Sequence, residues 1–291
     1  MGGALAVDRS REDEVTNEGR SPRLEAPAGA CDTHMHFYDA RYPTAPTALT
    51  TPPDATVADY RALRRRLGLS RTVVVQPTTY GTDNRCTLDG IVALGLDDAR
   101  GIAVVTEAAT ERALEDLTRG GMRGARFHML PGGAVPWDQL DRIAAKVQAV
   151  GWHVQLQLDG RELPEREAQV RAWPGRIVID HVGKFLEPVP PDHPAFLSLV
   201  RLVESGRVWV KLSAMYEVSK IGPPLYDDVG RLAKELVRIA PERMLWASNW
   251  PHPGNRPQDE AVLLDTLLEW APDEATRRRI LVDNPAEVYG F

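Results

Sequence analysis

One regularity constrains this sequence more than any other, namely the alternation of short apolar runs with amphipathic stretches. Eight of the runs are rich in Val, Ile and Leu and are bounded by turn residues, a pattern typical of buried β-strands. They are Ala30–His36, Thr72–Pro77, Gly101–Thr106, Gly124–Met129, His153–Asp159, Arg176–Val182, Val208–Ser213 and Met244–Asn249. Stretches with helical periodicity lie between them, among them Val57–Leu67, Glu111–Thr118, Trp137–Val150, Tyr226–Ile239 and Gln258–Trp270.

Strands that alternate with helices indicate an α/β fold with parallel pairing, because a helix supplies the crossover that parallel strands need. Eight such units favour closure into a (β/α)₈ TIM barrel. A barrel of this kind accommodates all 291 residues without a second domain. An open, doubly wound sheet is the alternative, since periodicity alone does not fix strand order.

Residues 1–27 differ in character from the rest of the chain. Acids, bases, Ser, Pro and Gly alternate there, which predicts a flexible, solvated N-terminal tail. A single catalytic barrel domain is expected over residues 28–291. The apolar run at the start is too short for a signal peptide, and no stretch reaches the about 18 apolar residues of a membrane span.

Net charge and cysteine content narrow the range of expected binding partners and cellular locations. The net charge of −6 gives no basic surface for nucleic acid. Two cysteines, Cys31 and Cys86, do not make a disulfide framework, so reduced thiols and a cytoplasmic location are expected. We therefore expect a small-molecule partner, with neither nucleic acid nor membrane. The sequence does not set the oligomeric state, and a homo-oligomer is compatible with it.

The first strand ends in two histidines that are separated by a single residue. His34 and His36 point to the same face of the strand, so in a barrel both reach its mouth. Two neighbouring imidazoles can bind a metal ion or exchange protons. A buried ring satisfied by the backbone is the simpler interpretation of one lone histidine, but a pair at a strand end favours a functional site.

Polar residues end four further strands. They are Arg126 and His128 on the fourth strand, Gln157 on the fifth, and His181 on the sixth with Lys184 just beyond it. Asn249 ends the eighth. Each alone fits a polar cap on a strand, but their convergence at one face favours an active site, because catalytic groups on barrels gather at the C-terminal ends of strands. His153 begins its strand and is expected at the opposite face.

Three proline-rich segments, Arg41–Asp54, Leu186–Pro194 and Pro251–Pro257, each follow a strand. In a barrel they lie over the active face. Proline restricts the backbone, so we expect them to form shaped walls of the site.

These residues resemble the amidohydrolase superfamily (amidohydrolase-related family 2) over about residues 28–291. More narrowly, the chain is similar to the branch that contains 2-pyrone-4,6-dicarboxylate lactonase, sugar-acid lactonases and D-galactarolactone isomerase. The segments that carry the resemblance are Asp32–Tyr38, Leu130–Val135, Asp180–Lys184, Ser248–His252 and Asn284–Glu287. Among them, Leu130–Val135 and Asn249-Trp250 are closest to the isomerase. The resemblance implies a barrel enzyme that acts on a small carboxylated lactone.

The superfamily pattern places metal ligands on several strand ends, and this chain matches only part of it. His34, His36 and His181 agree with the pattern. The fifth-strand histidine is absent, with Gln157 as its nearest counterpart, and Asn249 replaces the eighth-strand aspartate. The resemblance therefore implies no binuclear site. We expect no cofactor, although one zinc ion on His34, His36 and His181 stays an alternative.

The same replacement changes the chemistry that the resemblance implies. The eighth-strand aspartate activates water in the hydrolases, whereas Asn249 cannot accept a proton at neutral pH. It can position a hydroxyl or polarise a carbonyl. Attack by a hydroxyl of the substrate itself is then easier, because the nucleophile is held near the lactone carbonyl. Isomerisation of a 1,5-lactone to a 1,4-lactone is the expected reaction.

Cations near the site suit a substrate carboxylate. Arg126 offers planar, bidentate recognition and Lys184 a compact charge. Tyr80, Tyr216 and Arg256 are further candidates for substrate contact, together with Gln157, and His128 joins the catalytic candidates. Two alternatives stay open at this point, namely a lactone hydrolase that uses one zinc ion and a barrel that binds a ligand without catalysis.

Overall fold

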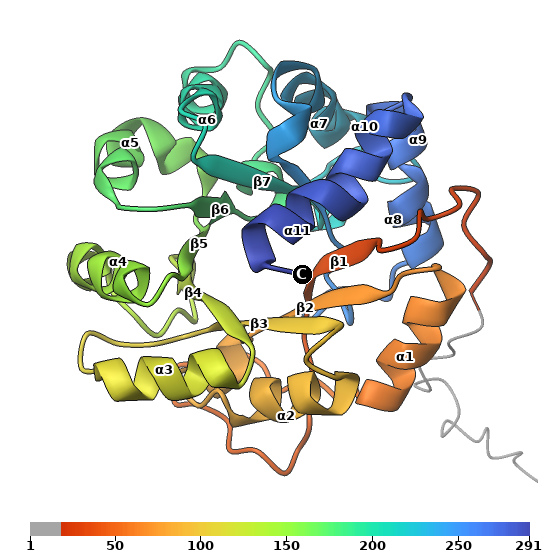
Figure 1. Ribbon diagram of the computed structural model, residues 1–291. Helices are drawn as coiled ribbons and strands as arrows, with labels where there is room; N and C mark the ends of the chain where they lie inside the picture. Colours follow the sequence, from red (N-terminus) through yellow and green to blue (C-terminus); the bar gives the residue numbers. More distant parts are fainter. Residues whose placement is uncertain (1–18) are drawn as a thin grey trace, which may run out of the picture.

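The computed structural model describes residues 19–291, and its centre is a barrel of eight parallel strands (Figure 1). The strands pair in chain order, with β1 next to β2 and so on to β8, which excludes the doubly wound alternative. Their bounds are β1 Cys31–Met35, β2 Arg71–Val75, β3 Ala99–Ala103, β4 Met122–His128, β5 His153–Gln157, β6 Ile177–Ile179, β7 Val208–Leu212 and β8 Met244–Trp246. All eight predicted strands are therefore confirmed, each within a few residues.

The first and last strands meet through the residues that carry the site. Asn249 donates its N–H to the carbonyl oxygen of His34, and His36 donates to that of Trp250, both at 2.8 Å. Asp32 reinforces this junction, because its carboxylate accepts from the Ser248 hydroxyl at 2.6 Å and from the Ser248 N–H at 3.0 Å. The end of β1 and the segment after β8 are thus fixed to one another.

Helices surround the barrel (Figure 1). They are α1 Val57–Arg66, α2 Arg85–Leu94, α3 Glu111–Arg119, α4 Leu140–Ala149, α5 Leu163–Ala172, α6 Pro194–Glu204, α7 Asp227–Ile239, α8 Glu260–Asp265, α9 Leu267–Trp270, α10 Glu274–Arg278 and α11 Asn284–Tyr289. The five predicted helical stretches are confirmed with two refinements. The stretch from Trp137 opens with a short 3₁₀ turn, and the stretch to Trp270 is divided between α8 and α9 at Thr266.

The N-terminal end of the barrel is closed by the end of the chain. In Figure 1 helix α11 lies across the barrel, with the C-terminus at its centre. Val288 and Tyr289 pack with apolar residues from the strands, including Cys31 and Val73. The ring of His153 lies edge-on to Tyr289, with ring centroids 5.2 Å apart. His153 therefore belongs to the face opposite the site, as predicted.

The described part of the predicted tail is attached to the barrel. The backbone N–H groups of Arg23 and Leu24 donate to the Asp265 carboxylate at 2.8 and 3.0 Å, and Leu24 is buried. The prediction of a solvated tail is thus wrong for these residues, because a buried carboxylate on α8 supplies an acceptor for them. The prediction for residues 1–18 lies outside the described residues. Within residues 19–291, no helix is long and apolar enough to cross a membrane.

Candidate active site

A pocket lies at the C-terminal ends of the strands, where the sequence predicts the site. Its cavity measures about 470 Å³. Strand-end and loop side chains that line it are His36, Arg126, His128, Gln157, His181, Lys184, Glu217 and Asn249. The three proline-rich segments contribute Leu49, Leu186 and Pro253, so the prediction that they form walls is confirmed. The structure thus brings the principal predicted residues together, with His34 buried beside His36.

The tautomers of His34 and His36 follow from their partners. Their Nε2 atoms lie 3.2 Å apart, and His36 Nδ1 lies 2.8 Å from the carbonyl oxygen of Val75. A carbonyl oxygen only accepts, so neutral His36 carries its proton on Nδ1 and accepts through Nε2. His34 then donates from Nε2, and its Nδ1 is left as an acceptor. Burial lowers the pKa of His36 to about 3, which keeps this ring neutral.

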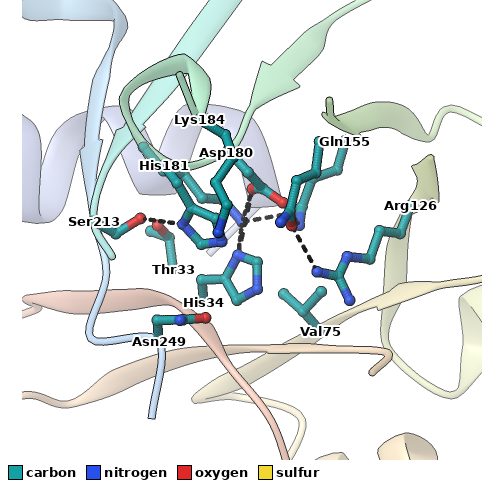
Figure 2. Close-up of polar contacts among 12 residues, drawn as sticks. Thr33, His34, Val75, Arg126, Gln155, Asp180, His181, Lys184, Ser213 and Asn249 are labelled. Atoms are coloured by element: carbon teal, nitrogen blue, oxygen red, sulfur yellow. Dashed lines mark hydrogen bonds and ion pairs between the residues drawn. The ribbon is translucent and has the colours of Figure 1, made fainter. Parts of the chain in front are cut away.

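The acceptor nitrogen of His34 faces a lysine that the sequence analysis did not single out. Lys211, on β7, places Nζ 3.2 Å from His34 Nδ1, 2.7 Å from Gln155 Oε1 and 3.4 Å from Asp180 Oδ1. Figure 2 shows His34, Gln155 and Asp180 directed toward one another, and Lys211 Nζ contacts all three. The side chains of Lys211 and Asp180 have no solvent exposure. A buried ion pair therefore lies in the centre of the barrel.

Burial and charge act on this pair in opposite directions. Burial lowers the pKa of Lys211 to about 8, although the negative charge of Asp180 acts to raise it. For Asp180, burial alone would raise the pKa, but the positive charge of Lys211 and the charges of other neighbours hold it below its ordinary value. Both groups are therefore charged at neutral pH.

His181 stands on a tight turn directly after β6. Its backbone has φ of 56° and that of Val182 has 54°, in the left-handed region that is costly for residues with a side chain. Hydrogen bonds from the backbone N–H of Gly183 to Asp180 and of Lys184 to His181 hold the turn. The Nδ1 atom of His181 lies 2.8 Å from Ser213 Oγ. Nε2 has no hydrogen-bond partner among the described residues, so it is available to a ligand.

Arg126 enters the pocket from β4 and is held by two acceptors. Its Nη1 donates to the carbonyl oxygen of Gln76 and its Nη2 to Gln157 Oε1, both at 2.8 Å. Within the described part of the chain, its buried Nε and the Nδ1 of His128 have no partner. Burial lowers the pKa of His128 to about 3. Arg126 is thus oriented by Gln157 and retains N–H groups for a ligand.

Asn249 has a defined amide orientation. Its Nδ2 lies 3.1 Å from Glu217 Oε1 and 2.8 Å from the Tyr216 hydroxyl. A carboxylate only accepts, so the amide nitrogen must face Glu217. The other oxygen of Glu217 pairs with the Lys184 ammonium. The carbonyl oxygen of Asn249, Oδ1, is therefore the part left for a ligand, and it can only accept a hydrogen bond.

A second set of residues holds Asn249 through a series of hydrogen bonds outside the pocket. The Tyr216 hydroxyl lies 2.8 Å from His252 Nδ1, and His252 Nε2 lies 3.1 Å from Glu260 Oε1. Because Glu260 accepts, His252 donates from Nε2 and accepts from the Tyr216 hydroxyl through Nδ1. The Tyr216 oxygen is then free to accept from Asn249, and Arg66 donates to Glu260 at 2.6 Å. Glu217, His252 and Glu260 were not among the predicted site residues.

Three predicted substrate contacts lie outside the pocket wall. The Tyr80 hydroxyl accepts from the Asp39 N–H at 2.8 Å and donates to the Asp39 carbonyl oxygen at 3.1 Å, so it is used in fixing a loop. Tyr216 contacts Asn249 rather than the cavity. Arg256 is exposed. The loop positions of Tyr80 and Arg256 explain the difference, since sequence does not fix where a loop side chain points.

The superfamily pattern raises the question of whether these residues suit a metal ion. Over residues 19–291, the compact group of three candidate ligands is His34, Asp180 and His181, whose ligand atoms lie within 4.8 Å of one another. His36, expected as a ligand, is not in this group. Lys211 Nζ contacts His34 and Asp180. An ammonium group there competes for the same donor atoms, so the donor set as it stands does not fit a metal ion.

The barrel and the strand-end pocket define an α/β-barrel enzyme whose reactive groups lie at the C-terminal face. The family model described as Amidohydrolase matches residues 31–291, and the chain belongs to this family. It is an enzyme of the amidohydrolase superfamily, and the alternative of a non-catalytic barrel is set aside.

Similar proteins support this assignment along nearly the whole chain. D-galactarolactone isomerase of Agrobacterium fabrum is 36% identical, covering 93% of this chain and 94% of the relative. 2-Pyrone-4,6-dicarboxylate hydrolase of Comamonas testosteroni is 34% identical, covering 92% of each chain. A crystal structure of an Agrobacterium tumefaciens protein in its apo form is 36% identical with a TM-score of 0.90, covering 94% of this chain and 98% of the other. Relatives of this kind include both a lactone isomerase and a hydrolase.

Proposed function

We propose that the enzyme isomerises the lactone of a sugar diacid, or of a related carboxylated hydroxy acid, without a metal ion. The observation that carries this proposal is the orientation of Asn249. Its amide nitrogen is held by Glu217 and Tyr216, which leaves Oδ1 as the amide atom that can accept a hydrogen bond from a ligand. An acceptor at this point positions a substrate hydroxyl but does not deprotonate water.

The reaction needs one proton transfer in each direction. A substrate hydroxyl attacks the lactone carbonyl, the ring C–O bond breaks, and the released oxygen takes up a proton. His181 can serve both steps, because Nε2 is free while Ser213 holds Nδ1 at 2.8 Å. Burial lowers the pKa of His181 well below its ordinary value, which keeps the ring neutral and makes its protonated form a strong acid for the second step. With Nδ1–H donating to Ser213 Oγ, the lone pair for the first proton lies on Nε2.

The substrate carboxylate has a matching cation in Arg126. Its two outer nitrogens each use one N–H on Gln76 or Gln157, which leaves further N–H groups toward the pocket. Lys184 is shared with Glu217 and adds a weaker attraction. Two relatives, a galactarolactone isomerase and a pyrone dicarboxylate hydrolase, are named for carboxylated lactones, which agrees with this substrate class. Two buried free cysteines agree with a cytoplasmic location.

Hydrolysis of the same lactone is the second candidate, and Glu217 favours it. This carboxylate lines the pocket beside Asn249 and can accept a proton from water. Its oxygens already accept from Asn249 and Lys184, which reduces their availability. We therefore place isomerisation first, since an internal hydroxyl has an effective molarity of roughly 10⁵–10⁸ M over a separate nucleophile.

Isotope labelling separates the two reactions. A sugar-diacid 1,5-lactone is incubated with the enzyme in ¹⁸O-labelled water, and early products are followed by NMR and mass spectrometry against an enzyme-free control. Isomerisation gives an unlabelled 1,4-lactone first. Labelled open acid as the first product would establish hydrolysis. Asn249→Asp is the companion variant, and we expect it to raise the hydrolytic share of the product.

A further inference from the structure

We infer that Lys211 supplies a resident cation in the position that a metal ion would need, and that removing its charge would create a zinc site from His34, Asp180 and His181. The inference deepens the metal-free part of the proposed function. Its test measures metal binding rather than turnover, so the isomerase assignment can fail while this inference stands, and the reverse.

The first support is the position of the ammonium group. Nζ lies 3.2 Å from His34 Nδ1 and 3.4 Å from Asp180 Oδ1, and these two atoms lie 3.3 Å from one another. Zinc binds imidazole nitrogen and carboxylate oxygen at about 2.0–2.2 Å. A zinc ion bound by both atoms would therefore lie in space next to Nζ, and the two cations cannot share these donors.

The second support is the direction of the hydrogen bonds. Lys211 can only donate and the Val75 carbonyl can only accept, and the two imidazoles lie between them. Protons therefore point one way, from Nζ to His34 Nδ1, from His34 Nε2 to His36 Nε2, and from His36 Nδ1 to Val75. This series of hydrogen bonds engages every ring nitrogen of His34 and His36. Neither ring has a free lone pair for a metal ion while Lys211 stays charged.

The third support is the charge balance of the buried group. The Asp180 carboxylate and the Lys211 ammonium pair at 3.4 Å, and Lys211 Nζ lies 3.2 Å from His34 Nδ1, which accepts from it as a neutral imidazole. A divalent ion beside Lys211 would add two uncompensated charges to a site with no solvent exposure. Without the lysine charge, Asp180 is left as an unpaired anion beside two imidazoles. Two histidines and one carboxylate with an open position form a common zinc set.

A purely structural ion pair is the competing interpretation. Under it, Lys211 only balances Asp180, and its replacement leaves a destabilised barrel with no affinity for metal. Under the inference, the replacement converts the same atoms into ligands. Metal affinity therefore distinguishes the two, whereas stability alone does not.

The experiment compares zinc binding by the wild-type chain, Lys211→Met and Lys184→Met. Each is purified, stripped with chelator, checked by circular dichroism, and titrated with zinc against a competing chromophoric chelator. We expect Lys211→Met to bind one zinc ion at least about 100-fold more tightly than wild type, since two charge-assisted contacts no longer compete. Lys184→Met is the matched control, because it removes a nearby lysine that lines the pocket but does not contact His34, and it should gain nothing. Adding His181→Ala to Lys211→Met should abolish the gain.

Three results would overturn the inference. They are one tightly bound zinc ion per wild-type chain, a folded Lys211→Met with no gain over wild type, and an equal gain in Lys184→Met. If Lys211→Met does not fold, Lys211→Gln repeats the titration with a polar, uncharged head. Imidazole ¹⁵N spectra of the wild type add a test that needs no folded variant. They should place the proton of His34 on Nε2 and that of His36 on Nδ1, and the opposite tautomers would also overturn it.

Discussion

The site has two parts whose charged groups differ in their exposure to solvent. The inner cluster consists of Lys211, His34, Asp180 and Gln155, and the outer chain consists of Lys184, Glu217, Asn249, Tyr216 and His252. The ion pair of the inner cluster has no exposed side-chain surface, whereas Lys184 and Glu217 are 9% and 14% exposed and line the pocket. The inner cluster can therefore set the electrostatics of the barrel without touching substrate, whereas Lys184, Glu217 and Asn249 of the outer chain line the pocket and can contact a substrate.

The largest expected difference between the two parts is in how much a substitution lowers the free energy of unfolding. Asp180→Ala leaves the Lys211 charge buried and unpaired, so we expect the free energy of unfolding to fall by about 3–5 kcal/mol. Glu217→Gln breaks a pair that water can reach, and should cost about 1 kcal/mol or less. Urea unfolding followed by circular dichroism measures both. The double variant Asp180→Ala with Lys211→Met should recover most of the loss, and equal losses for the two single variants would remove the distinction.

Substrate binding tests which buried cation faces the ligand. Arg126 lines the pocket and has unused N–H groups, whereas Lys211 does not line it. Arg126→Ala should raise KM for a carboxylated lactone by about 10–100-fold, with a smaller effect on kcat, because a charge-assisted contact is lost. Steady-state kinetics checks this, with Arg126→Lys expected to retain part of the affinity. Unchanged constants would make Arg126 a structural residue.

Tyr216 tests whether the outer chain positions Asn249. Tyr216→Phe removes one of the two acceptors that hold the Asn249 amide, so we expect kcat to fall by about tenfold with little change in KM. Tyr80→Phe is the matched control, because that hydroxyl bonds to the Asp39 backbone and Tyr80 does not line the pocket. A similar fall in both variants would show a general effect on packing. A rise in KM with kcat unchanged would argue against positioning.

The sequence predicts the outer parts of the site better than the centre. The His34 and His36 pair, His181 and Asn249 could be placed because strand periodicity and the C-terminal ends of barrel strands fix which way such residues face. Lys211 left a signal, since a lysine inside the apolar run Val208–Ser213 is rare for a buried strand. The role of Lys211, however, depends on its contacts with residues of other strands.

Those partners could not be read from sequence, for two physical reasons. Contacts between Lys211, Gln155 and Asp180 depend on the stagger between strands, and local patterns do not encode it. Glu217 lies in a loop, and His252 contacts Glu260 across another, so their orientation depends on backbone turns with positive φ such as that of His252 at 63°. Tyr80 lies outside the pocket lining for the same reason.

The smallest expected effect is on the pH dependence of kcat/KM. It tests whether Lys184 or the inner cluster titrates between pH 7 and pH 9. Burial lowers the pKa of Lys184 to about 8, with Asp180 raising it, Arg126 lowering it and Glu217 in contact. Lys184 is therefore charged below about pH 8 and neutral above it, so attraction for a substrate carboxylate weakens as pH rises through that value. We expect kcat/KM to fall a few-fold between pH 7 and pH 9, roughly the worth of an exposed charge contact. Lys184→Arg keeps its charge and should remove this limb. Because burial also lowers the pKa of Lys211 to about 8, a limb that persists in Lys184→Arg would assign the titration to the inner cluster.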